Sequence, residues 1–394
     1  MTDTTAGGLR REIDWKGAFW VASGVPALVL FSIGGIAGMT MEAAFLVWML
    51  SMLLGFVQSF TYAEIAGLFP NKSGGASVYG AAAWLKYGKF LAPLSVWCNW
   101  LAWTPVLSLG CAIASAYIVN ALAGAAPDLG TWQLFSFTIP GLVDISFGAT
   151  FFIGALLMLL VFAIQHRGIL GTAKVQTVVG LLVIIPMLIV GLVPHFTGGV
   201  NYDNFSPAIG EWANSNWTLF FGGLFIAAWS TYAFETAICY TSEFKNPGRD
   251  TFKAIFYSGL LCVVIYTLVP FTFQGVLGVE GMTQPGIVDG SGVAAAMAQM
   301  VHGGSFVDSI LQMLMILALL LAIMTAMAGS SRTLYQGSVD GWLPRYLSRT
   351  NERGAPTAAM WTDLGFNLIL LSFAASDAGA YYFILAISNC GYII

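Results

Sequence analysis

Long apolar stretches recur along the whole chain, and short polar segments separate them. A membrane-spanning helix needs about 20 consecutive apolar residues, and ten stretches approach or exceed that length. We expect spans at residues 17–40, 43–68, 90–122, 145–165, 173–195, 217–242, 253–278, 305–337, 357–375 and 379–394. The alternating pattern of membrane β-barrel strands is absent. The sequence therefore predicts an all-α membrane protein.

Composition agrees with this interpretation. Of the 394 residues, 58% are hydrophobic and 9% are charged, whereas soluble domains carry about 25% charged residues. The five cysteines lie in apolar stretches without metal-type spacing, so we interpret them as packing residues. The last stretch is still apolar at Ile394, so we expect a longer protein with about twelve spans in full.

All 15 Lys and Arg residues fall in every second loop of this arrangement. These basic loops are 1–16, 69–89, 166–174, 243–253 and 332–356. The remaining loops, near 124–144, 196–216 and 279–304, contain none. Basic residues accumulate in cytoplasmic loops, so the pattern predicts a multi-pass protein of the cell membrane with a cytoplasmic N-terminal tail, residues 1–16. Within the fourth basic loop we expect Glu243 and Asp250 to form ion pairs with the neighbouring Lys and Arg residues.

Two of the expected spans contain residues that disturb a continuous helix. In the first span, Ser23-Gly24-Val25 precedes Pro26, which lacks a backbone donor. In the sixth, Trp229-Ser230-Thr231-Tyr232 precedes Glu235, a carboxyl that is costly at membrane depth unless it faces a cavity or a partner. Matched breaks five spans apart indicate an inverted-repeat transporter with its site near the midplane. A simple kink is the alternative for either break alone.

Three motifs carry a resemblance to a known family. They are Tyr62-Ala63-Glu64-Ile65-Ala66 with Phe69-Pro70, Ser73-Gly74-Gly75 and Tyr79-Gly80; Phe234-Glu235 with Glu243, Asn246-Pro247 and Arg249-Asp250; and Ser331-Arg332 with Asp340-Gly341-Trp342-Leu343-Pro344. In these motifs the chain resembles the amino acid–polyamine–organocation (APC) superfamily, in particular its bacterial amino acid permeases. The resemblance extends over most of the chain.

The resemblance implies a secondary active transporter that moves an amino acid, GABA or a polyamine across the cytoplasmic membrane by alternating access. It implies a LeuT-like fold of two inverted repeats with five spans each, here residues 17–195 and 217–394, and with discontinuous first and sixth helices. Proton coupling or exchange is the expected driving mode. Sodium symport and a transporter-like solute sensor are the alternatives. No cofactor is implied.

The family binds its substrate between the first, third, sixth and eighth spans. By resemblance, the substrate-binding residues are Ser23, Gly24, Val25, Asn99, Ala102, Trp103, Trp229, Ser230, Thr231 and Tyr232. Trp229 would be the aromatic gate over the solute, and Glu235 the carboxyl linked to the conformational change. Asn99 and Trp103 have an alternative role in interhelical packing.

The chain departs from the family at positions that bear on substrate and coupling. The glycine-rich turn of the first span is reduced to Gly24, and Ala233 replaces a glycine of the sixth, which weakens the case for an α-carboxylate substrate. Around Gly180 the fifth span is purely apolar, without the buried lysine of some proton-coupled members. Thr325 is a sodium-ligand candidate or a back-bonded hydroxyl. Glu235 either exchanges a proton during transport or stays neutral and structural.

Other functional classes find little support in the sequence. His166, His195 and His302 are far apart and lack metal-ligand spacing. A nucleophile elbow and a phosphate-binding loop are both absent, so we predict no enzymatic activity. No filter-like pattern favours a channel, and the basic loops are too short and scattered for a nucleic-acid surface. The expected partners are a small solute and the lipid bilayer.

Overall fold

The structure, a computed structural model, describes residues 8–140, 143–205, 217–288, 290–376 and 378–393. Its α-helices, in chain order, are α1 (Trp15–Ala22), α2 (Val29–Thr40), α3 (Ala44–Leu68), α4 (Ala76–Trp84), α5 (Leu91–Trp103), α6 (Pro105–Leu122), α7 (Ala149–Gln165), α8 (Ile169–Thr197), α10 (Trp217–Thr231), α11 (Pro247–Met282), α12 (Pro285–Val288), α13 (Val293–Met300), α14 (Ser305–Val339), α15 (Thr357–Ala374) and α16 (Ala378–Ile393). The 3₁₀ helices are η1 (Pro26–Leu28), η2 (Met41–Ala43), η3 (Pro127–Gly130), η4 (Tyr202–Phe205), η5 (Tyr232–Glu243) and η6 (Arg345–Ser348).

Within the part of the chain that the structure describes, six helical segments are long and apolar enough to cross a membrane. They are Trp15–Leu68, Leu91–Leu122, Ile169–Thr197, Pro247–Met282, Ser305–Val339 and Thr357–Ala374. The first of them is 54 residues long and contains two of the predicted spans. The chain turns between those two spans at Met41, whose φ of 51° is incompatible with a helix. Two shorter apolar helices lie at 149–165 and 217–228.

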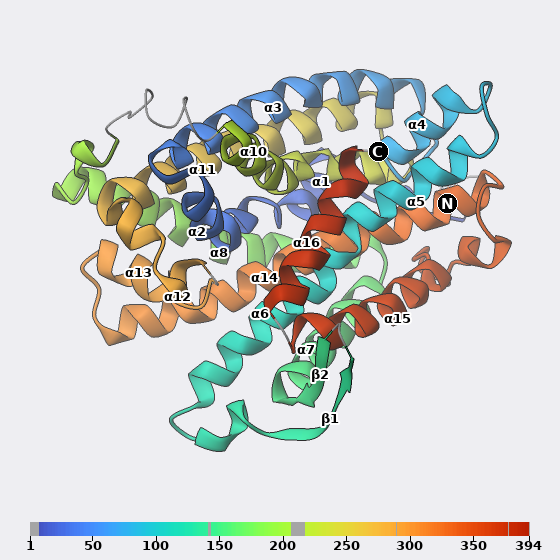
Figure 1. The fold of residues 1–394 in the computed structure, drawn as a ribbon. Coiled ribbons are helices and arrows are strands. Elements are labelled where there is room, and N and C mark those ends of the chain that lie inside the picture. The colour runs from blue at the N-terminus through green and yellow to red at the C-terminus, as the bar shows by residue number, and fades with distance from the viewer. Residues whose placement is uncertain (1–7, 141–142, 206–216, 289, 377, 394) are drawn as a thin grey trace.

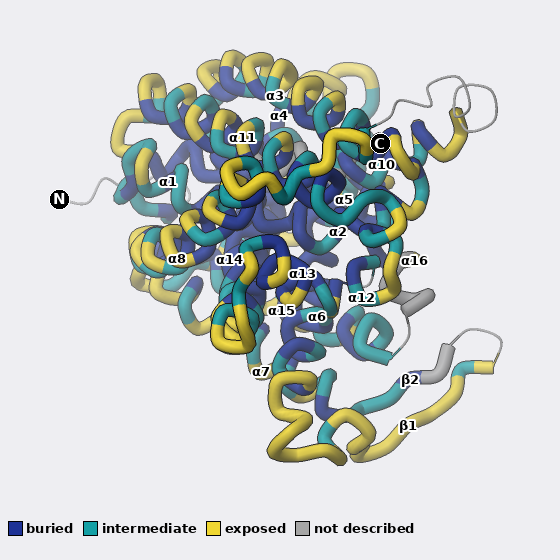
Figure 2. Tube along the Cα trace, turned by 90° about the vertical axis from the view of Figure 1, so that its left-hand side faces the viewer, coloured by how far each residue is buried: buried dark blue, intermediate teal, exposed yellow. Residues whose placement is uncertain are grey.

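The long helix α14 lies inside the bundle, while α3 and α11 lie side by side on one face of it (Figure 1). Nearly all of α14 from Leu319 to Ser338 is buried, and Figure 2 shows exposed residues on the outer side of α3. Val57 on α3, Ile185 on α8 and Val264 on α11 are apolar and exposed. Such outward apolar faces suit the acyl chains of a bilayer, where exposure of apolar groups has no cost.

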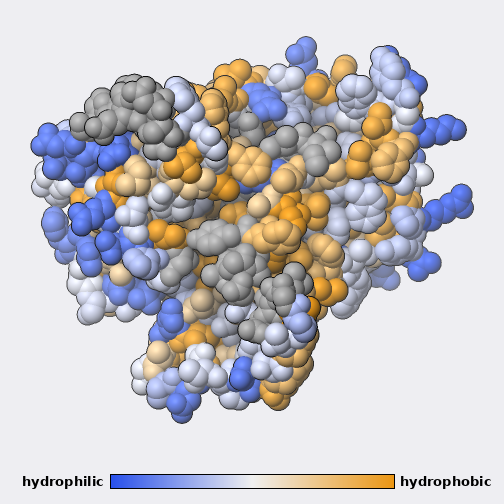
Figure 3. Space-filling model, in the orientation of Figure 1, coloured by the Kyte–Doolittle hydropathy of each residue, from blue (hydrophilic) through white to orange (hydrophobic). Residues whose placement is uncertain are grey.

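The five basic loops of the sequence meet at one end of the bundle. The contacts that join them are Arg10 to the Glu352 carbonyl, Arg11 to Asn71 (2.6 Å), the Lys245 amide to the Ile13 carbonyl (2.8 Å) and Asn351 to the His166 carbonyl (2.8 Å). In Figure 1 the N-terminus and α4 lie at one end, opposite α12 and α13. Hydrophilic residues gather at the left and right edges of the face in Figure 3, with hydrophobic residues between them.

The predicted all-α fold is confirmed for most of the chain, but it omits a short β-hairpin that follows η3. There β1 (Gln133–Ile139) and β2 (Val143–Gly148) form an antiparallel hairpin in which Phe135 pairs with Phe147. The next helix, α7, therefore begins at Ala149 rather than near residue 145. β1 has only 7 residues and is exposed over almost its whole length, so it is a loop strand and lacks the length of a membrane strand.

The clustering of basic loops leads to a test of orientation. Cysteines introduced singly at Asp128 and Glu280 should react with a membrane-impermeant maleimide added to intact cells, because both positions are exposed and belong to segments that were predicted as loops without basic residues. Cysteines at Lys86 and Arg349, equally exposed in basic loops, should react only after permeabilisation. The five native cysteines are first replaced. Labelling of Asp128→Cys only in permeabilised cells would contradict the orientation.

Candidate functional site

The first interruption begins where Pro26 removes a hydrogen-bond donor. In a continuous α-helix the amide of residue 26 would donate to the Ala22 carbonyl, and proline has no such hydrogen. In the structure the Val25 amide donates to the Ala22 carbonyl instead, at 3.3 Å, and α1 ends at Ala22. The turn remains tight, because Ser23 and Val25 keep helical dihedrals. The Val21 carbonyl consequently loses its usual partner, the Val25 amide.

Two side chains from other helices satisfy the Val21 carbonyl. The Thr325 hydroxyl on α14 donates to it at 2.6 Å, and the Gln176 amide nitrogen on α8 donates at 3.1 Å. Gly24 allows α14 to approach this closely, since a Cβ atom there would lie 2.4 Å from both the Leu321 carbonyl oxygen and Thr325 Oγ1. The break is therefore fixed by side chains of α8 and α14.

The second interruption lies at the junction of α10 and η5. The α-helical pattern ends at Thr231, and the next 12 residues form η5. 3₁₀ helices longer than three or four residues are uncommon and often mark hinges. The Ser230 hydroxyl lies 3.1 Å from the Ser32 hydroxyl on α2, and Ser32 in turn donates to the Leu28 carbonyl at 3.1 Å. The two broken spans thus contact each other directly.

One hydroxyl group joins both interruptions. Tyr266 on α11 lies 2.7 Å from the Val25 carbonyl oxygen and 2.9 Å from the Ser230 carbonyl oxygen, so its single hydroxyl hydrogen is shared between the two acceptors. The side chain is fully buried, and its ring lies 5.5 Å from that of Trp48 on α3. The interruptions predicted at Ser23–Val25 and Ser230–Tyr232 are therefore present, and they lie together in the interior.

The other predicted site residues have more varied positions. Asn99 Oδ1 on α5 accepts a hydrogen bond from Thr333 at 3.3 Å, which is the interhelical contact left open above. The Ala102 carbonyl accepts a hydrogen bond from Ser388 on α16, and Trp103 is buried. Neither of these hydrogen bonds of Asn99 and Ala102 reaches an interruption. Glu235 in η5 is buried. The side chains of Trp229, Thr231 and Tyr232 lie outside the described residues.

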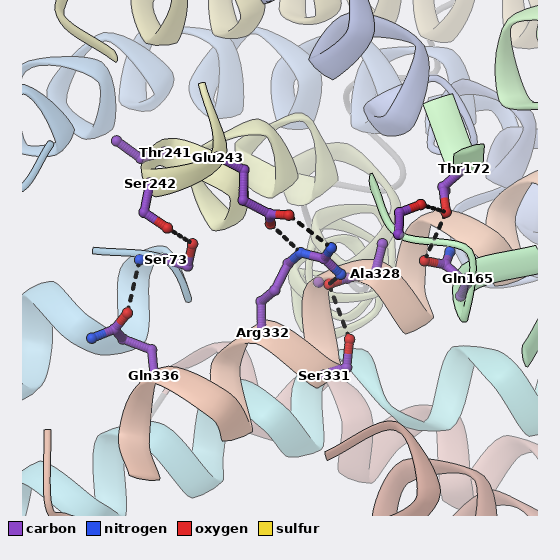
Figure 4. Close-up of polar contacts among 12 residues, drawn as sticks. Ser73, Gln165, Thr172, Thr241, Ser242, Glu243, Ala328, Ser331, Arg332 and Gln336 are labelled. Carbon is purple, nitrogen blue, oxygen red and sulfur yellow. Dashed lines mark hydrogen bonds and ion pairs between the residues drawn. The ribbon is translucent and has the colours of Figure 1, made fainter. Parts of the chain in front are cut away.

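A buried ion pair joins the inner end of η5 to α14 and corrects an expected pairing. Glu243 pairs with Arg332 through two hydrogen bonds, one from Nη2 to Oε2 at 3.2 Å, and both side chains are almost fully buried (Figure 4). The sequence placed Arg332 in a loop and paired Glu243 with a neighbouring cation. Charge spacing along the chain did not reveal this partner, because Arg332 belongs to another helix. Asp250 does contact its neighbour Arg249, at 3.3 Å.

The glycine-rich loop that follows α3 contacts α14 and η5 near the buried ion pair. The Ser73 amide donates to Gln336 Oε1 on α14 at 3.0 Å, and its hydroxyl lies 2.5 Å from that of Ser242 (Figure 4). The Gly74 amide donates to the Cys239 carbonyl at 3.1 Å, with a φ of 92° that favours glycine. Together with the ion pair, these contacts join η5, α14 and the loop after α3 at the end of the bundle where the basic loops lie.

Comparison with known proteins identifies the family. Residues 13–394 match the amino acid permease family. The chain belongs to this family. The APC superfamily resemblance of the sequence motifs is thereby confirmed.

Three proteins show what the chain is similar to. An uncharacterized transporter of Legionella pneumophila is 26% identical and aligns with 82% of this chain and 66% of its own length. The branched-chain amino acid permease BcaP of Bacillus subtilis is 24% identical, with 78% and 58% covered, and a polyamine transporter of Oryza sativa is 23% identical, with 87% and 57% covered. The permease chain therefore spans roughly half to two thirds of the length of these relatives.

Tyr266, Gln176 and Asp363 are buried polar residues that the sequence analysis did not single out. Tyr266 and Gln176 hold the interruptions, and Asp363 on α15 accepts hydrogen bonds from Trp100 (2.9 Å), Thr104 (2.5 Å) and Ser330. The sequence did contain an indication of Asp363, because an ionisable residue within an apolar span is rare and usually has a functional or structural role. Tyr266 and Gln176 had none, because uncharged polar residues are common in membrane helices. Gln176 lies one helical turn before Gly180, outside the apolar stretch expected around that residue.

Proposed function

We propose that this permease is a secondary active transporter that moves an amino acid or a related small amine across the cell membrane by alternating access. The observation that carries the proposal is the junction of the two interruptions through Tyr266. Discontinuous helices expose amide and carbonyl groups at membrane depth, where they can bind the charged ends of a solute. Belonging to the amino acid permease family supports the same conclusion.

The substrate site proposed here is the region around the junction. It comprises Ser23, Gly24 and Val25 from the first interruption and Trp229, Ser230, Thr231 and Tyr232 from the second, with Trp229 as the gate. Asn99, Ala102 and Trp103 would support this site from α5. The names of the relatives include a branched-chain amino acid permease and a polyamine transporter, so the class extends from amino acids to polyamines.

Alternating access gives the two halves of the site different tasks. We propose two inverted repeats, residues 17–195 and 217–394, that rock against each other. The inner contacts of Arg332, Ser73 and Gln336 seal the cytoplasmic side in this arrangement. Glu235 is the proposed carrier of a coupling proton, because a buried carboxyl without a fixed cation favours its neutral form and can release the proton when access changes.

Uptake by purified protein in proteoliposomes tests this function. The wild-type protein should accumulate at least one solute from a panel of amino acids, GABA and polyamines when a gradient is imposed. Tyr266→Phe should reduce that uptake by about tenfold or more, because both interruptions lose the hydroxyl that joins them. Tyr257→Phe on the same helix is the matched control, since Tyr257 is 43% exposed and lies on the outer surface. Failure of the wild type to move any solute would contradict the proposal.

A further inference from the structure

A closed triangle of hydrogen bonds holds the first interruption. Its corners are Gln176 Nε2 on α8, Thr325 Oγ1 on α14 and the Val21 carbonyl oxygen. The three edges measure 2.9 Å from Gln176 to Thr325, 3.1 Å from Gln176 to Val21 and 2.6 Å from Thr325 to Val21. All three elements are buried, with Gln176 at 0% and Thr325 at 1% exposure. At these distances the triangle leaves no space for an ion between its members.

The chemistry of the triangle fixes the orientation of the Gln176 amide. A carbonyl oxygen such as that of Val21 only accepts hydrogen bonds, so the amide nitrogen of Gln176, and not its oxygen, must face it. Thr325 uses its single hydrogen on the same carbonyl, so its oxygen accepts the second N–H of Gln176. Gln176 Oε1 is buried and finds no donor among the described residues. The amide nitrogen of Gln176, rather than its oxygen, is therefore the atom that holds the first interruption.

The same two oxygens are the kind of ligand that an alkali cation requires. Carbonyl and hydroxyl oxygens bind hard cations, and Thr325 was a sodium-ligand candidate on sequence grounds. Here both oxygens face a neutral amide that is tethered to α8. The amide supplies two partially positive hydrogens where a free ion would supply a full charge.

We propose that the Gln176 amide takes the place of a cation between the first span and α14, so that transport requires no sodium. This inference rests on the proposed transport function and makes Gln176 the residue that sets ion selectivity. Because the Gln176 amide is covalently part of α8, no ion gradient can drive its movement across the membrane, and the amide is present in every transport cycle. Replacing the amide by a carboxylate of the same shape would bring an oxygen against the Val21 carbonyl, and a cation could then relieve the repulsion.

The test compares the wild type with Gln176→Glu at alkaline pH, in sodium and in choline media. Wild-type uptake in proteoliposomes should differ by less than about twofold between the media. Uptake by Gln176→Glu should fall about tenfold or more in choline and recover in sodium, because the carboxylate, Thr325 and the Val21 carbonyl would then provide three oxygens for the ion. Gln176→Leu, which has neither donor nor charge, should be low in both media.

Gln165→Glu is the matched control. Gln165 is also buried, and its amide nitrogen donates to a carbonyl of α14, that of Met324, at 2.6 Å, but none of its hydrogen bonds among the described residues reaches the first span. This variant should lose activity equally in both media. Sodium-dependent uptake by the wild type, indifference of Gln176→Glu to sodium, or equal sodium rescue of Gln165→Glu would overturn the inference.

Thermal unfolding in detergent separates this inference from the proposed function. Sodium should raise the Tm of Gln176→Glu relative to choline and leave that of the wild type unchanged, since an ion that binds only the folded state stabilises it. This measurement needs no substrate. If the wild type moved no solute, the proposed function would fail while the Tm comparison still decided the role of Gln176. A sodium-induced rise in the wild-type Tm would overturn that role.

Discussion

Arg332→Met is expected to destabilise the permease by about 3–5 kcal/mol. The substitution keeps a long apolar side chain on α14 but leaves the Glu243 carboxyl buried without its cation. A buried charge that loses its partner has no water to replace it, so the cost exceeds the value of the pair itself. Thermal unfolding of the purified protein in detergent should show a clear loss in Tm.

Two further variants separate the pair from its surroundings. Arg332→Met combined with Glu243→Met should recover most of the lost stability, because replacement of both partners by apolar side chains is often neutral or better. Lys72→Met should cost only about 0–1 kcal/mol. Its pair with Asp340 is 2.9 Å long, but the Lys72 side chain is 33% exposed. Equal losses for Lys72→Met and Arg332→Met would show that burial of the pair is irrelevant.

Gly24→Ala is expected to reduce transport by about tenfold or more. The added Cβ would lie 2.4 Å from the Leu321 carbonyl oxygen and from Thr325 Oγ1, so α14 and the first span must move apart. That movement would disrupt the hydrogen bonds of Thr325 and Gln176 to the Val21 carbonyl. Uptake in proteoliposomes, normalised to folded protein, measures the effect.

Gly35→Ala provides the control for a glycine of the same span. No heavy atom lies within 4 Å of a Cβ atom at Gly35, and alanine favours helix over glycine by about 1 kcal/mol. This variant should transport like the wild type and unfold at an equal or higher temperature. Wild-type uptake by Gly24→Ala would refute the close-approach argument.

Local properties of the chain made part of this structure predictable. The break before Pro26 follows from a missing N–H, and the presence of long apolar helices follows from apolar length, so both could be predicted from short windows of sequence. The gathering of basic loops at one end could be predicted because each loop carries its own charges. The hairpin of β1 and β2 escaped because its strands are short, and because β2 overlaps the start of the apolar stretch that was predicted as a span from residue 145.

The hydrogen-bond partners that hold the two interruptions could not be predicted from short windows of sequence. Thr325 and Val21 are 304 residues apart, and Tyr266 and Val25 are 241 apart. Each contact depends on which faces of several helices meet, and apolar helices with weak periodicity give little information about their faces. The Glu243–Arg332 pair was missed for the same reason, since nearer cations offered an apparent solution along the chain.

The helical type of η5 has a mechanical consequence. A 3₁₀ helix rises about 2.0 Å per residue and an α-helix about 1.5 Å, so the 12 residues of η5 measure about 24 Å in place of about 18 Å. Near the start of this segment, Tyr266 holds the Ser230 carbonyl, and at its end Arg332 holds Glu243. The sixth span therefore contains about one α-helical turn of extra length between two anchors, and any conversion of η5 to α-helix would draw those anchors together by that amount.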